Sequence, residues 1–240
     1  MTTQMLKKQL FTGAIVSLLT FTVACNRPIQ TPADTSASPQ GATTEAPTQT
    51  ADPAAKTVAT VARVGETAPE FTGVDSNGKT HNLSDFRGKT VVLEWTNHEC
   101  PFVRKHYESG NMQRLQQEKT GQGIVWLSVV SSAPGQQGSV DKTKANELTE
   151  SRNASPTAVL LDPDGTIGRL YGARTTPHMY IIDPEGKLVY DGAIDSIPSS
   201  DPADIPKADN YVTMAIQDLK SGQPIRQATT QPYGCSVKYQ

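Results

Sequence analysis

The sequence predicts an α/β fold built around a parallel strand–helix–strand crossover. Residues 91–95 and 124–130 are short runs rich in β-branched and aromatic side chains, which is typical of buried strands. Between them, one helical pattern begins at Pro101 and is ended by Gly121 and Gly123, and proline is favoured at the first position of a helix. Because the two strands flank a helix of this length, we expect a right-handed parallel crossover.

The other elements surround this crossover. Residues 71–83 are a predicted β-hairpin, because Asn77-Gly78 is a preferred hairpin turn. Asp141 is a suitable N-cap for a polar amphipathic helix over residues 141–152. Further along the chain we expect a strand at residues 159–161, a short helix at 167–171, a β-hairpin at 175–190 and a helix at 208–219.

Composition divides the chain into a leader, a linker, a domain and a tail. Residues 61–222 have the size of one folded domain, and residues 223–240 form a tail without hydrophobic periodicity. Residues 26–60 consist mainly of Pro, Thr, Ala, Ser and Gln, with too few large apolar residues to offset the entropy of ordering. We therefore expect a disordered linker there. The formal net charge is −2 and no basic run is present, which argues against nucleic acid as a partner.

Residues 1–25 resemble an export signal. Lys7 and Lys8 precede an apolar stretch that is shorter than the roughly 20 residues of a membrane span. Cys25 ends a segment similar to a bacterial lipoprotein signal, in which the cysteine is lipidated; the alternative is an ordinary signal peptide with an incidental cysteine. Both alternatives predict an exported protein on the periplasmic or cell-envelope side, and the first anchors it to a membrane by lipid.

Cys100 is the candidate nucleophile, because it lies between a predicted strand and the start of a predicted helix. At a helix N-terminus, unpaired backbone N–H groups and the helix dipole stabilise a thiolate and lower the thiol pKa. Arg104, one turn further on, can add positive charge. The sequence therefore predicts a reactive cysteine at this point.

Glu94 is unusual, because it places a carboxylate inside an apolar strand. If its side chain lies on the face of the cysteine, burial should raise its pKa, and it could accept a proton. If it lies on the other face, we expect it to be paired with a base. The sequence leaves both alternatives open.

Two segments carry a resemblance to a known family. The order of the elements is similar to the thioredoxin fold, and the chain resembles its redoxin branch over about residues 62–222. That branch includes the alkyl hydroperoxide reductase/thiol-specific antioxidant proteins (peroxiredoxins) and membrane-anchored thiol–disulfide oxidoreductases. The segments are Trp95-Thr96-Asn97-His98-Glu99-Cys100-Pro101 and Thr176-Pro177 followed by Met179-Tyr180-Ile181-Ile182-Asp183. Cys-Pro-Phe-Val at 100–103 and the tail motif at 234–239 resemble an exported subgroup.

The resemblance implies a thioredoxin fold, with a central mixed sheet flanked by helices, an N-terminal β-hairpin and an extended C-terminal tail. It also implies a cis peptide bond between Thr176 and Pro177, close to the reactive cysteine. The residues expected to line the binding cleft are Trp95, Pro101, Thr176, Pro177 and His178.

The chain departs from the active-site motifs of both thioredoxins and peroxiredoxins. Val103 stands where thioredoxins carry their second cysteine, so a neighbouring cysteine cannot resolve an intermediate. Leu93 and Asn97 stand where peroxiredoxins carry Pro and Thr, and the Asn97 amide is the group that could partly replace the threonine hydroxyl. These departures weaken the case for peroxide activation more than the case for general thiol–disulfide chemistry.

Cysteine counting indicates how a catalytic cycle could close. If Cys25 is lipidated, Cys100 and Cys235 remain, and two cysteines in an oxidising compartment suggest a pair. We hypothesise that Cys100 attacks a peroxide or a disulfide and that Cys235, on the tail, resolves the intermediate. The alternative is a static disulfide that tethers the tail. The enzyme would need an external thiol reductant protein, and we expect no cofactor.

A non-catalytic binding module is the alternative to an enzyme. Its cleft would hold a partner protein or a metal, since His98, Cys100 and His178 could converge as ligands for copper or zinc. The simpler interpretation is that both histidines are polar residues that line a partly exposed cleft, with no metal bound.

Overall fold

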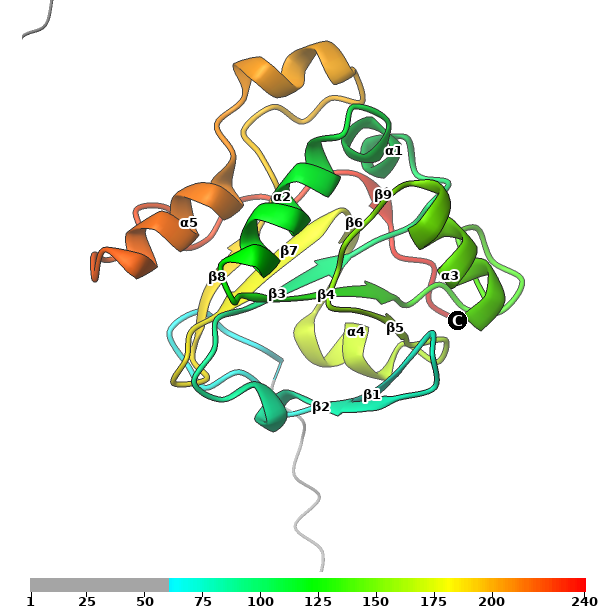
Figure 1. The fold of residues 1–240 in the computed structure, drawn as a ribbon, viewed down its shortest axis with the longest axis horizontal. Coiled ribbons are helices and arrows are strands. Elements are labelled where there is room, and N and C mark those ends of the chain that lie inside the picture. The colour runs from blue at the N-terminus through cyan, green and yellow to red at the C-terminus, as the bar shows by residue number, and fades with distance from the viewer. Residues whose placement is uncertain (1–60) are drawn as a thin grey trace, which may run out of the picture. The chain divides into compact units, whose positions relative to one another are not determined.

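A mixed β-sheet organises residues 61–240, the part of the chain that the computed structural model describes (Figure 1). Its strands are β1 (Thr72–Asp75), β2 (Thr80–Asn82), β3 (Val91–Trp95), β4 (Val125–Val130), β5 (Ala158–Leu161), β7 (His178–Ile182) and β8 (Leu188–Gly192). The seven strands lie in the order β2-β1-β5-β4-β3-β7-β8. β3, β4 and β5 are mutually parallel, whereas β1, β2, β7 and β8 join by antiparallel pairing.

The predicted crossover is confirmed, with one correction. β3 and β4 pair in parallel, and the chain between them is helical, as expected. It forms two helices, α1 (Pro101–Glu108) and α2 (Asn111–Gly121), so the prediction of a single helix was wrong. The break lies at Gly110, whose φ of 74° is a left-handed conformation that glycine adopts more readily than other residues.

The remaining helices agree with the pattern in type and differ at some boundaries. They are α3 (Lys142–Ser151), α4 (Thr166–Tyr171) and α5 (Tyr211–Lys220), together with 3₁₀ helices at Leu83–Phe86 and Pro202–Lys207. The Asp141 side chain caps α3 as predicted, since it accepts a hydrogen bond from Lys144 N at 2.7 Å. α5 begins three residues later than expected, because Asn210 is its N-cap and accepts from Thr213 N at 2.8 Å.

The sheet separates two apolar cores, and β3 contributes to both. Leu93 and Trp95 point into the core that α4 covers, whereas Val92 points into the core beneath α1, α2 and α5 (Figure 1). Every residue of β3 is buried, because both faces of the sheet are covered. The segment that carries Cys100 therefore follows a central, fully buried strand.

The C-terminal tail is ordered, contrary to what its lack of periodicity suggested. Within it, β9 (Cys235–Ser236) pairs antiparallel with β6 (Thr175–Thr176) in a separate two-stranded sheet. Beyond β9, Ala133 N donates to Lys238 O at 2.8 Å and the Tyr239 hydroxyl donates to Ala173 O at 2.8 Å. The tail is thus held along the edge of the domain.

The predictions for residues 1–60 lie outside the described residues. They are the export signal, the lipidation of Cys25 and the linker at residues 26–60. Among residues 61–240, no helix has both the length and the apolar character that crossing a bilayer requires.

Candidate active site

Cys100 is the N-cap of α1, as the sequence predicted. Its φ and ψ of −72° and 124° are extended, while its carbonyl oxygen already accepts from Val103 N at 3.0 Å and Arg104 N at 2.8 Å. Pro101 occupies the first helical position, where its missing N–H leaves no bond unmade. The turn before it closes through Cys100 N, which donates to Asn97 O at 3.1 Å.

A cis peptide bond lies beside the sulfur. Thr176–Pro177 is cis, and the Cys100 thiol donates to Thr176 O at 3.1 Å. Both expectations of the resemblance, the cis bond and its proximity to Cys100, are confirmed. The start of α1 and the cis-proline between β6 (Thr175–Thr176) and β7 therefore meet at this sulfur.

The second cysteine reaches the same point from the tail. In the β6–β9 pair, Cys235 is the partner of Thr176, whose carbonyl oxygen accepts from the Cys100 thiol, and the Cys235 side chain packs against the apolar cluster that contains Cys100. Both residues are free thiols in this structure. No spacing rule in the sequence predicts this contact, because it depends on how the tail crosses the domain.

The two thiols have opposite pKa shifts. Burial raises the pKa of Cys100, but hydrogen bonding with the Cys235 and Thr176 side chains and with the Val103 N–H outweighs it and leaves that pKa below its ordinary value. Burial and the contact with Cys100 raise the pKa of Cys235 to about 12. Cys100 is therefore the thiol that ionises, and Cys235 is the one that keeps its proton.

The tail closes the site. Cys100 has no solvent-exposed surface, and Phe102, Tyr233 and Cys235 pack against the apolar cluster that contains it. Gly234 lets the tail approach so closely, since a Cβ at this position would lie 2.1 Å from Thr176 O. The binding cleft that the resemblance implied is thus filled by the chain's own C-terminal segment.

Glu94 lies on the same side of the sheet as the cluster around Cys100, and it is fully buried. Its carboxylate accepts hydrogen bonds from four groups, which are the Tyr107 hydroxyl at 2.9 Å, Gln116 Nε2 at 3.2 Å, Trp126 Nε1 at 2.8 Å and the Ser128 hydroxyl at 2.9 Å. All four donors are neutral, and Glu94 makes no ion pair within residues 61–240, so the alternative of pairing with a base is wrong. Burial raises the pKa of Glu94 despite these bonds. Sequence reasoning identified Glu94 but missed its partners, which lie on other elements.

Three other predicted site residues make their contacts with other groups. Arg104 pairs with Glu108 at 2.8 Å on the exposed side of α1, so the expected charge next to Cys100 is not supplied by it. The Asn97 amide is used in the turn, where it accepts from Glu99 N at 2.9 Å and donates to Gln137 O at 3.2 Å. Trp95 is fully buried in the opposite core, so it is not a wall of the cleft.

The proposed convergence of histidines with Cys100 is also wrong. His178 Nε2 lies 2.7 Å from Asp191 Oδ1, and His178 Nδ1 accepts from Arg174 N at 3.3 Å. Both ring nitrogens are therefore used inside the protein. Burial lowers the pKa of His178 and of His98, which favours the neutral rings. Across residues 61–240, no group of three His, Cys, Asp or Glu side chains is arranged to hold a metal ion.

Fold and site together define a class. A thioredoxin fold that places a low-pKa cysteine at a helix start, beside a cis-proline, is that of a thioredoxin-like thiol oxidoreductase. The chain belongs to the AhpC/TSA family, whose model matches residues 64–191, slightly more than half of its length.

Similar proteins agree with this class. The thiol-disulfide oxidoreductase ResA of Geobacillus thermodenitrificans is 29% identical over 129 residues, which are 54% of this chain and 68% of that protein. ResA of Bacillus subtilis is 30% identical over 125 residues, which are 52% of this chain and 64% of that protein. The match thus spans about two thirds of each relative.

Two solved structures share the fold. A hypothetical protein from Sinorhizobium meliloti 1021 superposes with a TM-score of 0.63 at 19% identity, covering 75% of this chain and 97% of its own. An uncharacterised conserved protein from Geobacillus kaustophilus gives a TM-score of 0.63 at 23% identity, covering 74% and 93%. At these identities the likeness concerns the fold alone.

Proposed function

We propose that this protein exchanges thiols and disulfides through Cys100, with Cys235 as its resolving cysteine. The observation that carries the proposal is the place of Cys235: on the C-terminal tail, it pairs with Thr176 and packs against the cluster that contains Cys100, the N-cap of α1. Their opposite pKa shifts support distinct roles, because an attacking sulfur must ionise and a resolving thiol can wait in its protonated form. Cys235 thereby replaces the second cysteine of a Cys-x-x-Cys motif.

The proposed reaction has two exchanges. The Cys100 thiolate attacks one sulfur of a substrate disulfide, the Cys100–substrate S–S bond forms, and the leaving thiolate takes up a proton. Cys235 then loses its proton and attacks the Cys100 sulfur, which forms the intramolecular disulfide and releases the second substrate thiol. Two electrons pass from the protein thiols to the substrate. An external thiol reductant protein returns them.

Glu94 is the proposed proton acceptor of this cycle. Its raised pKa and its place on the Cys100 side of the sheet suit a group that takes and returns a proton. Tyr107 links it to that side, since its hydroxyl bonds the carboxylate and its ring belongs to the apolar cluster of Cys100.

A protein or small-molecule disulfide is the favoured substrate class. The ResA relatives are named thiol-disulfide oxidoreductases, which supports this choice. Peroxide reduction is the second candidate, because it fits the AhpC/TSA family to which the chain belongs. Against it, the Asn97 amide that could replace the peroxiredoxin threonine is used in the turn.

An exported, lipid-anchored location through Cys25 remains our proposal for where the reaction occurs.

Single-cysteine variants test the proposal. Cys100→Ser should abolish reduction of a model disulfide, and Cys235→Ser should accumulate a mixed disulfide on Cys100 that mass mapping detects. Wild-type protein treated with oxidised glutathione should form the Cys100–Cys235 disulfide, with a reduction potential above roughly −300 mV. A lower potential would support a static structural bond and contradict the resolving role. Hydrogen peroxide consumed at a rate that depends on Cys100, without disulfide reduction, would favour the second candidate.

A further inference from the structure

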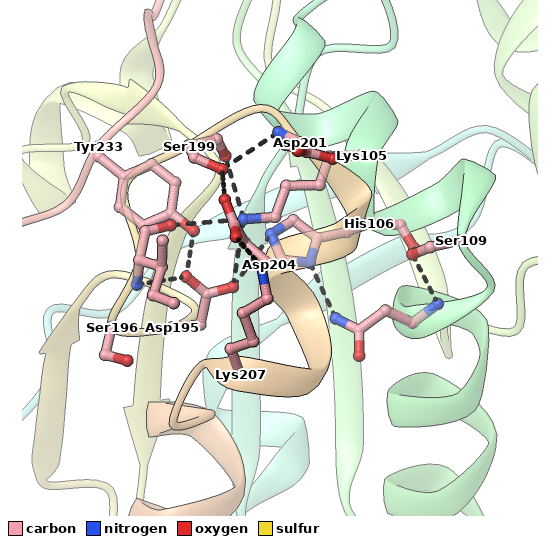
Figure 2. Close-up of polar contacts among 12 residues, drawn as sticks. Lys105, His106, Ser109, Asp195, Ser196, Ser199, Asp201, Asp204, Lys207 and Tyr233 are labelled. Atoms are coloured by element: carbon pink, nitrogen blue, oxygen red, sulfur yellow. Dashed lines mark hydrogen bonds and ion pairs between the residues drawn. The ribbon is translucent and has the colours of Figure 1, made fainter.

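Figure 2 shows a cluster of charged and polar side chains around Asp195, which includes Lys105 and Tyr233. At its centre, the Asp195 carboxylate lies 3.5 Å from Lys105 Nζ, and both side chains are almost completely buried. The Tyr233 hydroxyl donates a hydrogen bond to the same carboxylate. His106 Nε2 lies 3.7 Å from it and has no hydrogen-bond partner within residues 61–240.

This carboxylate connects the two segments that carry the cysteines. Lys105 belongs to α1, the helix that starts next to Cys100. Tyr233 belongs to the tail, two residues before Cys235. Asp195 therefore holds the nucleophile's helix with one oxygen and the tail with the other.

Packing around Tyr233 reinforces the connection. Its ring meets the Phe102 ring edge-on, with the centroids 5.8 Å apart, and Lys105 Nζ lies 5.7 Å from its centroid. Lys105 also donates to Ser199 O at 3.0 Å and to Ile197 O at 3.4 Å. The Asp195 carboxylate and two backbone carbonyl oxygens thus hold the ammonium group in one position, and a buried charge requires such partners.

Such a cluster is better suited to fixing geometry than to adding stability. Replacing a buried ion pair by apolar residues is often neutral or stabilising, so the pair alone gives little reason for its presence. Here it fixes the position of a tail that must lift whenever a substrate reaches Cys100, because that sulfur has no exposed surface.

We propose that Asp195, Lys105 and Tyr233 form a tail latch, which positions Cys235 on Cys100 and controls access to the nucleophile. A latched tail presents Cys235 to Cys100 at a high effective concentration, which favours the intramolecular disulfide. It also excludes outside molecules from Cys100. The redox part of this inference rests on the proposed function, whereas the access part does not.

Removing one hydroxyl tests the latch. Tyr233→Phe keeps the ring against Phe102 and deletes the bond to Asp195. In the reduced protein, alkylation of Cys100 by iodoacetamide, followed by peptide mass analysis, should become about tenfold faster. The glutathione equilibrium constant for the Cys100–Cys235 disulfide should fall about tenfold, a rise in reduction potential of about 30 mV for a two-electron couple.

Tyr211→Phe is the matched control, since the Tyr211 hydroxyl makes no hydrogen bond within residues 61–240. It should leave both quantities at their wild-type values. The double variant Lys105→Met with Asp195→Leu removes both charges without leaving either one buried alone, and it should shift both readouts in the direction of Tyr233→Phe.

The outcomes separate the two proposals. Unchanged alkylation and an unchanged disulfide equilibrium in Tyr233→Phe would overturn the latch, even if wild-type protein forms the disulfide. A lowered unfolding midpoint with both native-state readouts unchanged would assign the hydroxyl a purely structural role and also overturn it. If wild-type protein forms no Cys100–Cys235 disulfide, the proposed pairing fails, while the alkylation rates still decide the latch.

Discussion

At the scale of single residues, Cys100 and Cys235 illustrate how one contact gives two identical groups different chemistry. Burial, which is complete at Cys100 and partial at Cys235, by itself raises each pKa. Hydrogen bonding with the Cys235 and Thr176 side chains and with the Val103 N–H at the start of α1 lowers the pKa of Cys100. Cys235 is the donor in the same contact, so its proton becomes harder to remove. In the proposed reaction, these shifts favour Cys100 as the attacking sulfur.

Glu94 makes a prediction about pH. Burial raises its pKa in the folded protein, so the folded chain holds this proton more tightly than the unfolded chain does. Its contribution to stability is fully present below the unfolded pKa and is lost as pH rises through the folded pKa. As pH rises from about 4.5, the free energy of unfolding of wild-type protein should fall relative to that of Glu94→Gln, by up to about 1.4 kcal/mol per pH unit. Urea denaturation at a series of pH values measures this difference.

Glu108→Gln is the control for that measurement, because Glu108 is an exposed carboxylate on α1. It should follow the pH dependence of wild-type protein. Identical pH dependence in all three proteins would show that Glu94 is not a perturbed buried acid.

Because Glu94 is the proposed proton acceptor, it should also affect the reaction rate. Glu94→Gln should slow disulfide reduction at neutral pH by about 100-fold.

At the scale of elements, the short pair of β6 and β9 closes the active site. Gly234→Ala should push β9 away, because the added Cβ would lie 2.1 Å from Thr176 O and the residue has a φ of 131°. Cys100 should then react about tenfold or more faster with iodoacetamide in the reduced protein, since the tail no longer covers it. The rate constant of Cys100 alkylation is the measurement.

Gly222→Ala separates backbone strain from steric contact. Gly222 also has a positive φ, of 65°, but a Cβ there would have no atom within 4 Å. It should cost about 1–2 kcal/mol of stability from its conformation and leave the reactivity of Cys100 unchanged. Equal acceleration by both variants would mean that general destabilisation, not the β6–β9 contact, exposes the sulfur.

At the scale of the whole molecule, the proposed Cys100–Cys235 disulfide would close a loop of more than a hundred residues. A disulfide across such a loop removes conformational entropy from the unfolded chain, which the chain-entropy model sets at about 4–5 kcal/mol. Oxidised wild-type protein should therefore unfold at a higher guanidinium concentration than reduced protein. Cys235→Ser should unfold at the same concentration under both conditions. Equal midpoints for the two wild-type forms, with the disulfide verified by mass, would contradict the expected gain.

The pattern-based part of the fold was predictable because it depends on neighbours in the chain. Strand periodicity in residues 91–95, the proline at position 101 and the Asp141 cap are local signals, and each element formed where expected. The break at Gly110 and the strand at Cys235–Ser236 were missed. A single glycine in a helical pattern does not reveal whether it adopts a positive φ, and a two-residue strand has no period of its own.

The features of the site also divide into those that the sequence predicted and those that only the structure revealed. The sequence by itself determined that Cys100 starts a helix after a buried strand, and the family resemblance correctly placed a cis-proline beside it. Only the tertiary structure decided that Cys235 contacts Cys100, that Glu94 has four neutral donors, and that Asp195 joins α1 to the tail. The start of a helix depends on residues that are adjacent in the sequence. These contacts instead join residues that lie far apart in the chain, and only the close packing of the whole domain brings those residues together.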